Sequence, residues 1–353
     1  MNKTNLFPKT ITSISLFILF LLCIESIPAH TFAQETGHYH LLKQYPIGGE
    51  GGYDYLAFDN KAGRVFISHA THVVVFDVNA EKIVGDIPNT EGVHGIAFAQ
   101  EFNHGFTSNG KTNTVLMFDL KTLDSLKRIP VGEKPDAIIY DSFSKCILAC
   151  CGNSNGVSVI DAVTGTVKTL IPLGGAPEFA VSNDKGHVYI NLEDKNEVVG
   201  VDMKTFNVVR RMKLAPGESP TGLAMDEKTN RLFSGCANEC MVILNVEKGK
   251  VVGTFPIGKR VDAVVFDSEK KVAISSNGDG TLTVVREITP DKFEVAETVK
   301  TQVGARTETL DPKTHNLYLV TADFSPAPEA TKEQPHPRPT LIPNTMRLLK
   351  YGY

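Results

Sequence analysis

The chain has 353 residues, of which 42% are hydrophobic and 22% are charged, and its formal net charge is −4 at pH 7. This composition is typical of a globular protein and argues against intrinsic disorder and against several membrane spans. No dense cluster of Lys or Arg occurs, so no nucleic-acid partner is implied. The length suits either two ordinary domains or one large repeat architecture.

The first 33 residues are predicted to be a secretory signal peptide. Two lysines precede an apolar run over 11–24, and Thr31-Phe32-Ala33 fits the small-residue pattern of a cleavage site. A transmembrane anchor is the alternative, but hydroxyl residues interrupt the run and it is short for a bilayer span. We therefore predict a secreted or periplasmic protein, with one domain over 34–353 and no transmembrane segment after cleavage.

A repeat of 42 to 44 residues organises the rest of the chain. Each unit consists of four short apolar runs separated by turn residues, which indicates four strands, and the period is that of a propeller blade. Without helices, each sheet has to bury its faces against its neighbours. The sequence thus predicts an all-β, seven-bladed β-propeller with four antiparallel strands per blade. The units begin near Tyr45, Asn89, Val131, Leu173, Ala215, Ile257 and Thr301.

The two ends of the repeat array are predicted to meet in one blade. Residues 40–47 are predicted to form a strand ahead of the first complete unit, and the last unit ends at a third strand over 346–351. Pairing these two strands would close the ring and remove an open sheet edge. A Pro-rich insertion, 324–344, precedes that last strand and has the length of a lid or a disordered loop. Four third strands end in an aspartate that is expected to close a turn: Asp77, Asp119, Asp161 and Asp202.

The second strands contain degenerate copies of a Tyr-Val-Thr-Asn signature, and third strands end in Asp, with Ile or Val before it at Asp161 and Asp202. In these features the chain resembles the YVTN family of secreted bacterial β-propellers, from about His40 to Tyr351. The resemblance implies the fold and export but no particular reaction. The chain has no Trp, which sets it apart from WD40 blades and from quinone-dependent propeller dehydrogenases. The copies are Phe66-Ile67-Ser68-His69, Phe106-Thr107-Ser108-Asn109, Tyr189-Ile190-Asn191-Leu192 and Tyr318-Leu319-Val320-Thr321.

The residue that opens each first strand changes in chemistry from unit to unit, although the strand around it stays apolar. The first strand of every blade lines the channel of a propeller, so these seven residues are expected to form one ring near a mouth of the channel. We predict that this ring binds a ligand. Its members are Asp54, His94, Asp136, Glu178, Thr221, Asp262 and Arg306.

A divalent cation is one candidate ligand of the ring. The predicted metal ligands are Asp54, His94, Asp136, Glu178 and Asp262. An oxygen-rich set with a single imidazole suits Ca²⁺, Mg²⁺ or Mn²⁺ better than a structural zinc ion. The alternative is a water-filled channel in which the charged side chains pair with one another.

The connections between second and third strands are expected on the same face as the ring. Further ligand-binding candidates there are His69, Glu193, Asn277 and Asp323. His69 and His72 are three residues apart on a predicted loop, which is a weak metal-binding pattern. Cys236 and Cys240 are expected in one loop, as a local disulfide or as two free thiols. An odd number of cysteines follows the predicted cleavage site, so at least one thiol has to stay unpaired within the chain.

No nucleophile elbow, zinc-protease motif or phosphate-binding loop occurs in the sequence. We therefore expect a monomeric binding module whose ring takes a small molecule, a divalent cation or a protein partner. The alternative is a metal-dependent, lactonase-like hydrolase or lyase. In that case His94 would be the acid/base and Arg306 would steady an anionic substrate. A third interpretation is a scaffold whose ring only hydrates the axis.

Overall fold

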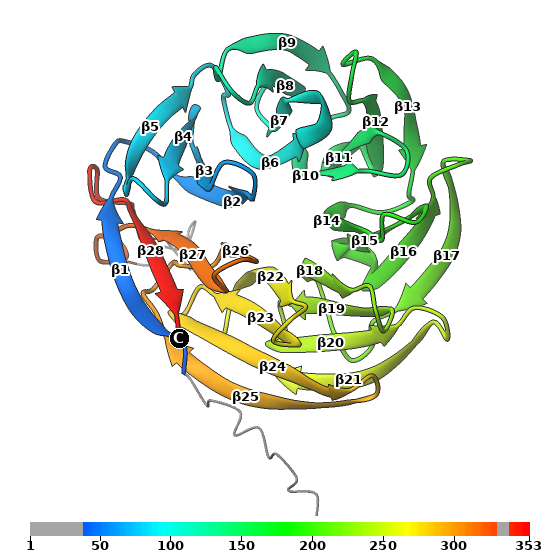
Figure 1. Ribbon diagram of the computed structural model, residues 1–353. Coiled ribbons are helices and arrows are strands. Elements are labelled where there is room, and N and C mark those ends of the chain that lie inside the picture. The colour runs from blue at the N-terminus through cyan, green and yellow to red at the C-terminus, as the bar shows by residue number, and fades with distance from the viewer. Residues whose placement is uncertain (1–37, 330–338) are drawn as a thin grey trace, which may run out of the picture. The chain divides into compact units, whose positions relative to one another are not determined.

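Each predicted unit corresponds to one antiparallel sheet of four strands, and seven such sheets stand in a ring around a central axis (Figure 1). The computed structural model describes residues 38–329 and 339–353. The predicted all-β, seven-bladed fold is confirmed. The predicted signal peptide and the middle of the Pro-rich insertion lie outside the described residues. Within them, no helix has the length and hydrophobicity needed to cross a bilayer.

The first four blades follow one another along the chain, each running from the axis outward. Blade 1 is β2 (Tyr53–Asp59), β3 (Arg64–His69), β4 (His72–Asp77) and β5 (Lys82–Ile87). Blade 2 is β6 (Val93–Ala99), β7 (His104–Asn109), β8 (Thr114–Asp119) and β9 (Ser125–Pro130). Blade 3 is β10 (Pro135–Asp141), β11 (Cys146–Cys151), β12 (Gly156–Asp161) and β13 (Val167–Pro172). Blade 4 is β14 (Pro177–Ser182), β15 (His187–Leu192), β16 (Glu197–Asp202) and β17 (Asn207–Lys213).

The last three blades continue the order, and three 3₁₀ turns complete the described structure. Blade 5 is β18 (Pro220–Asp226), β19 (Arg231–Cys236), β20 (Cys240–Asn245) and β21 (Lys250–Pro256). Blade 6 is β22 (Val261–Asp267), β23 (Val272–Asn277), β24 (Thr281–Thr289) and β25 (Lys292–Lys300). Blade 7 is β26 (Glu308–Asp311), β27 (Asn316–Thr321), β28 (Arg347–Gly352) and β1 (His40–Pro46). The turns are η1 (Gln100–Phe102), η2 (Gly152–Ser154) and η3 (Glu193–Lys195).

The two ends of the described chain close the ring, as the sequence predicts. Strand β1 pairs antiparallel with β28 as the outermost strand of blade 7. Figure 1 shows β1 in blue beside β28 in red. Each innermost strand contacts the innermost strands of the two adjacent blades, and β26 contacts both β22 and β2. Blade 7 is therefore packed between two neighbouring blades, as every other blade is.

The aspartates at the ends of the third strands close turns, which confirms the prediction. In blade 3, Asp161 accepts backbone N–H bonds from Val163 at 3.1 Å and Thr164 at 2.9 Å. The hydrogen bond from the Thr164 amide is the main reason why the pKa of Asp161 is lowered to about 2. Asp77, Asp119 and Asp202 accept from the same two relative positions.

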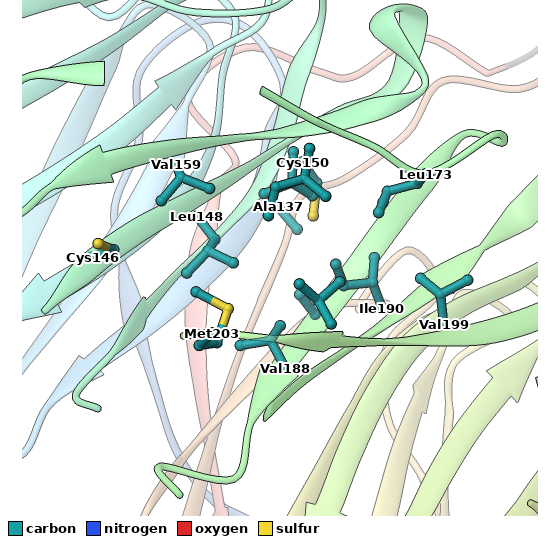
Figure 2. Packing of buried hydrophobic residues seen from close by; sticks show 14 of the residues in the cluster. Ala137, Cys146, Leu148, Cys150, Val159, Leu173, Val188, Ile190, Val199 and Met203 are labelled. Carbon is teal, nitrogen blue, oxygen red and sulfur yellow. The ribbon is translucent and has the colours of Figure 1, made fainter. Parts of the chain in front are cut away.

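The hydrophobic core lies between the blades, because successive side chains of a strand point to opposite faces of its sheet. Leu148 of β11 packs toward blade 4, where it meets Val188 and Ile190 of β15 (Figure 2). The adjacent Ile147 packs toward blade 2. Both faces of each sheet are therefore buried, which explains why the middle strands are apolar at nearly every position.

All five cysteines of the described residues are free and buried in this core. The expectation that Cys236 and Cys240 share a loop is wrong in detail. Cys236 ends β19, Cys240 begins β20, and the two are register partners across the hairpin. The apolar spacing of two adjoining strands extends to these positions, so both thiols pack between blades.

The closing blade provides a stability test. Leu349 of β28 is fully buried in the cluster between blades 6 and 7. We expect Leu349→Ala to lower the free energy of unfolding by about 2–5 kcal/mol, because it leaves a cavity in that cluster. The control, Leu41→Ala in the partner strand, removes a side chain that is 42% exposed and should change stability by less than about 0.5 kcal/mol. Urea denaturation measures both, and equal effects would contradict this account of ring closure.

Candidate axial site

The seven ring residues predicted from the sequence lie at equivalent places in the blades. Six of them are the second residue of an innermost strand, whereas Arg306 precedes β26 by two residues. In these six strands the pairing register shifts at or beside the ring residue. A β-bulge of this kind re-aims a side chain that would otherwise lie between sheets. The bulges therefore explain how charged side chains escape the apolar core.

Three ring residues form a compact acid and imidazole group. Nδ1 of His94 donates to Oδ2 of Asp54 at 2.5 Å, and it lies 3.6 Å from Oδ1 of Asp136. One ligand atom from each of the three residues lies within 4.8 Å of the other two. A Cβ atom on Gly110 would come within 2.8 Å of Nε2 of His94, so glycine leaves room for the imidazole there. These three residues are the types of side chain that can hold a metal ion.

Arg306 joins this group to the other side of the ring. Its Nη1 atom lies 2.7 Å from Oδ2 of Asp262, and its Nη2 atom lies 3.4 Å from Oδ1 of Asp54. Asp54 therefore contacts both His94 and Arg306. Two cationic groups face three aspartates here, and Glu178 adds a further carboxyl, so acidic groups outnumber basic ones in the ring.

Burial makes this excess of acidic groups costly. It raises the pKa of Glu178 to about 8, and the nearby Asp136 and Asp262 add to the effect. Burial also raises the pKa of Asp262 to about 7, although Arg306 opposes the shift. The same cause raises the pKa of Asp136. The ring therefore holds protons that carboxyl groups normally lose at neutral pH, and an added cation would displace them.

The pKa of His94 is raised, which is the direction expected beside acidic neighbours. Burial works against a charged imidazole, but the hydrogen bond to Asp54 and the charge of Asp136 outweigh it and raise the pKa of His94. Lys134 opposes this shift on His94 and lowers the pKa of Asp136 and Glu178. Lys134 was not among the predicted site residues, because it precedes the strand and is not part of the repeated column.

Tyr55 lies next to the ring in the channel, and the sequence analysis did not predict it as a site residue. The Tyr55 ring, from blade 1, meets Phe179 of blade 4 edge-on, with ring centroids 5.4 Å apart. Burial and the ring carboxylates raise the pKa of its phenol well above the usual value. A signal existed, because five of the seven residues that follow the ring positions are small. The column is Tyr55, Gly95, Ala137, Phe179, Gly222, Ala263 and Thr307.

The channel continues as a mostly apolar cavity of about 580 Å³ along the lower halves of the innermost strands. Phe58, Phe98 and Phe266 are among its lining residues. Glu308 also lines it, in the column that holds Leu56 and Val264 in blades 1 and 6. Both carboxyl oxygens of Glu308 are buried without a hydrogen-bond partner among the described residues. The charged ring and this cavity are thus chemically different ends of one channel.

The remaining predicted ligand-binding residues do not all join the ring. Thr221 donates to the carbonyl of Val261 at 3.0 Å and thereby ties blade 5 to blade 6. Glu193, in η3, lies close enough to raise the pKa of Glu178 and Asp262. It therefore belongs to the approach to the ring.

Three others face different surroundings. Asn277 is buried and donates to Oγ1 of Thr281 at 3.2 Å, so it braces the β23–β24 hairpin. Asp323 is paired with Arg347 beside the Pro-rich insertion. His69 ends β3 and is covered by the backbone of Gly49. These three residues occupy equivalent positions in the repeat, but their side chains make contacts near their own blades and do not meet in a common site.

The fold and site define a seven-bladed β-propeller with an acidic axial ring. A scan of protein-family models finds no match, so the YVTN resemblance stands on the motifs alone. No curated protein sequence matches either. A structure of Kuenenia stuttgartiensis hydrazine synthase is similar, with a TM-score of 0.68 at 15% identity, over 76% of this chain and 92% of that one. In all, 1834 chains of known structure match, so the fold is widespread and this likeness shows the fold alone.

Glu308 provides a pH test of the channel wall. Burial raises the pKa of its carboxyl well above the usual value. The unfolded chain ionises this group near pH 4 while the folded chain keeps the proton, so stability falls as pH rises above that point. We expect Glu308→Leu to raise the free energy of unfolding by roughly 1–3 kcal/mol at pH 8 and by less at pH 4. Chemical denaturation at both pH values measures this. An equal gain at both would contradict a protonated Glu308.

Proposed function

We propose that this protein is a binding module whose axial ring takes a divalent cation and, through it, a small molecule or a partner. The main support is the charge imbalance of the ring. Burial raises the pKa of Glu178 to about 8 and that of Asp262 to about 7. A divalent ion would supply the missing positive charge and lower both values.

Three residues are the proposed direct ligands: Asp54, His94 and Asp136. Their ligand atoms already lie within 4.8 Å of one another, so small side-chain rotations would bring them around one ion. Carboxylate oxygens favour Ca²⁺, Mg²⁺ or Mn²⁺, and a single imidazole is compatible with Mn²⁺. Glu178 and Asp262 would balance the charge from the other side of the ring. Three protein ligands leave coordination positions open for an exogenous ligand.

Arg306 gives the ring its selectivity in this proposal. It already pairs with Asp262 and Asp54, so it competes with a cation for Asp54. An anionic or carbonyl-bearing ligand would contact both the ion and the guanidinium. The predicted signal peptide and the resemblance to YVTN propellers favour a role outside the cytoplasm, with the ring face presented to its partner. We expect the protein to act as a monomer.

Mn²⁺ binding tests the cation. We expect the wild type to bind one Mn²⁺ at the ring. Asp54→Asn or Asp136→Asn should weaken that binding by roughly 100-fold, which is about 2.8 kcal/mol. Isothermal titration calorimetry and the loss of the free Mn²⁺ spectrum in electron paramagnetic resonance measure it. The matched control is Asp323→Asn. It removes a carboxylate that pairs with Arg347 outside the ring, so Mn²⁺ binding should stay unchanged. Equal affinity in the wild type and both ring variants would refute the cation site.

A metal-dependent hydrolase is the second candidate, favoured by one observation. His94 is held by Asp54 through Nδ1, next to Arg306, which is how a general acid/base and an anion-stabilising group would be arranged. In this second candidate the carboxylates of Asp54, Asp136, Glu178 and Asp262, and not His94, would hold a metal that polarises the carbonyl of a lactone or ester. No nucleophilic side chain is needed, because a metal-bound water would serve as the nucleophile.

Turnover of lactone and ester substrates tests the second candidate. We expect activity that disappears with chelator and falls by about 100-fold or more in His94→Ala, the range typical of a lost general acid/base. Activity that survives both treatments would come from another site. Cation binding without any turnover would leave the binding module as the function.

A further inference from the structure

The mostly apolar cavity in the lower half of the channel has a mouth of its own. Its lining includes Asn60, which follows β2 and is exposed, and Gln100, which follows β6 and is half-buried. Both lie past the ends of innermost strands, whereas the ring residues lie where these strands begin. The cavity therefore opens on the face opposite to the ring. Its volume of about 580 Å³ is within the range of small-molecule sites, roughly 300–1,000 Å³.

The lining of this cavity contains a buried acidic group without a partner. Glu308 is the first residue of β26 and is 5% exposed. Neither of its carboxyl oxygens has a hydrogen-bond partner among the described residues. No cationic group in that part of the chain is close enough to lower its pKa. Because buried carboxyl groups are normally hydrogen-bonded or paired, Glu308 has polar capacity that the protein itself leaves unused.

The other blades show that the fold does not require a carboxyl group at this position. Five blades have an apolar residue there that also lines the cavity: Leu56, Ile96, Ile138, Leu223 and Val264. Blade 4 has Ala180 at the same position. An unpaired buried carboxyl group lowers stability, and an apolar side chain would not. A glutamate in this apolar column therefore points to a ligand.

Two other polar groups of the lining are already hydrogen-bonded. Nε2 of Gln100 donates to Oδ1 of Asp59 at 2.6 Å. The hydroxyl of Tyr140 donates to a carboxyl oxygen of Glu101. Among these polar lining residues, Glu308 is thus the one that has no partner within the described part of the chain.

Three phenylalanines line the cavity two positions further along their strands than the column of Glu308, which is nearer the mouth: Phe58, Phe98 and Phe266. Each packs against an aromatic ring from the second strand of the preceding blade, with ring centroids 4.9 to 5.8 Å apart. These contacts hold the rings in place, so the apolar part of the cavity is preformed. Aromatic rings attract both apolar groups and cations.

The charge of Glu308 depends on what fills the cavity. Burial raises the pKa of its carboxyl well above the usual value. The backbone of Ser276 opposes this shift, although it makes no hydrogen bond of normal geometry with the carboxyl. A positive charge beside the carboxyl would stabilise the ionised form, and the proton would leave to solvent. A cationic group is therefore the complement that this carboxyl lacks.

We propose that this cavity binds a small organic amine, with its ammonium group at Glu308 and its apolar body among Phe58, Phe98 and Phe266. The carboxyl belongs to the inner end of the cavity and the phenylalanines lie nearer the mouth, so the amine enters with its ammonium group first. The ammonium group supplies both the donor hydrogens and the charge for a charge-assisted hydrogen bond. This site is separate from the axial ring and does not depend on cation binding there.

Phenethylamine and phenethyl alcohol provide the test, because they share an apolar body and differ in the ammonium group. We expect the full chain to bind the amine with a Kd below about 1 mM and roughly 10-fold or more tightly than the alcohol. Glu308→Gln keeps the size of the side chain and removes its charge. It should weaken amine binding by roughly 10-fold or more and leave alcohol binding nearly unchanged. Isothermal titration calorimetry measures both affinities.

Two further variants locate the binding site. Ala57→Phe adds a ring at a half-buried lining position and should weaken the binding of both probes, because it fills the cavity. Glu287→Gln is the matched control. It removes another buried carboxyl, in β24, which does not line the cavity, and should leave both affinities unchanged.

Three results would overturn the proposal. The first is an alcohol affinity equal to or higher than that of the amine, which would make the cavity a site for neutral molecules. The second is a Glu308→Gln variant that binds the amine as tightly as the wild type. The third is unchanged amine binding in a folded Ala57→Phe variant, which would place the amine elsewhere, such as at the acidic ring. Glu308→Gln decides the question alone if Ala57→Phe does not fold.

Discussion

Packing of one sheet against the next is the interaction on which the whole structure depends. Each blade exposes two apolar faces, and neither can be buried within the blade. Leu148 and Ile147 are adjacent in β11 and yet pack against different neighbouring blades. The seven sheets therefore stabilise one another only as a complete ring. The pairing of β1 with β28 gives the last sheet its fourth strand, and β26 then contacts both β22 and β2.

The axial ring is a consequence of the same geometry. Seven innermost strands surround one axis. A side chain that a bulge redirects away from the sheet faces therefore points into the channel. Acidic side chains from distant parts of the chain then meet in a partly buried space. Glu178 and Asp262 show the cost in their raised pKa values, and Arg306 offsets only part of it. This imbalance is the physical basis of the proposed cation site.

The repeat made much of this site predictable. Alignment of the repeat units is enough to predict one ring of side chains, because equal position in the repeat means equal height along the axis. The ring residues predicted in this way include Asp54, His94, Asp136, Glu178, Asp262 and Arg306. The same reasoning failed for Asn277 and Asp323, whose side chains bind within their own blades. Alignment of the units did not identify Tyr55 either. An aromatic residue next to the charged column is expected in the hydrophobic core, and only the structure shows that it meets Phe179.

The sequence by itself determined the number of blades, the strand order, the closing strand and the column of ring residues, because all of these follow from a period and from alternation along one chain. Only the tertiary structure decided which ring residues touch, in which direction their pKa values move and that Tyr55 of blade 1 meets Phe179 of blade 4. It also shows that Asp86 lies beside His72 and that, within residues 38–329 and 339–353, neither ring nitrogen of His69 has a hydrogen-bond partner. These features depend on distances across the axis and between strands, and such distances are properties of the closed ring that no single repeat contains.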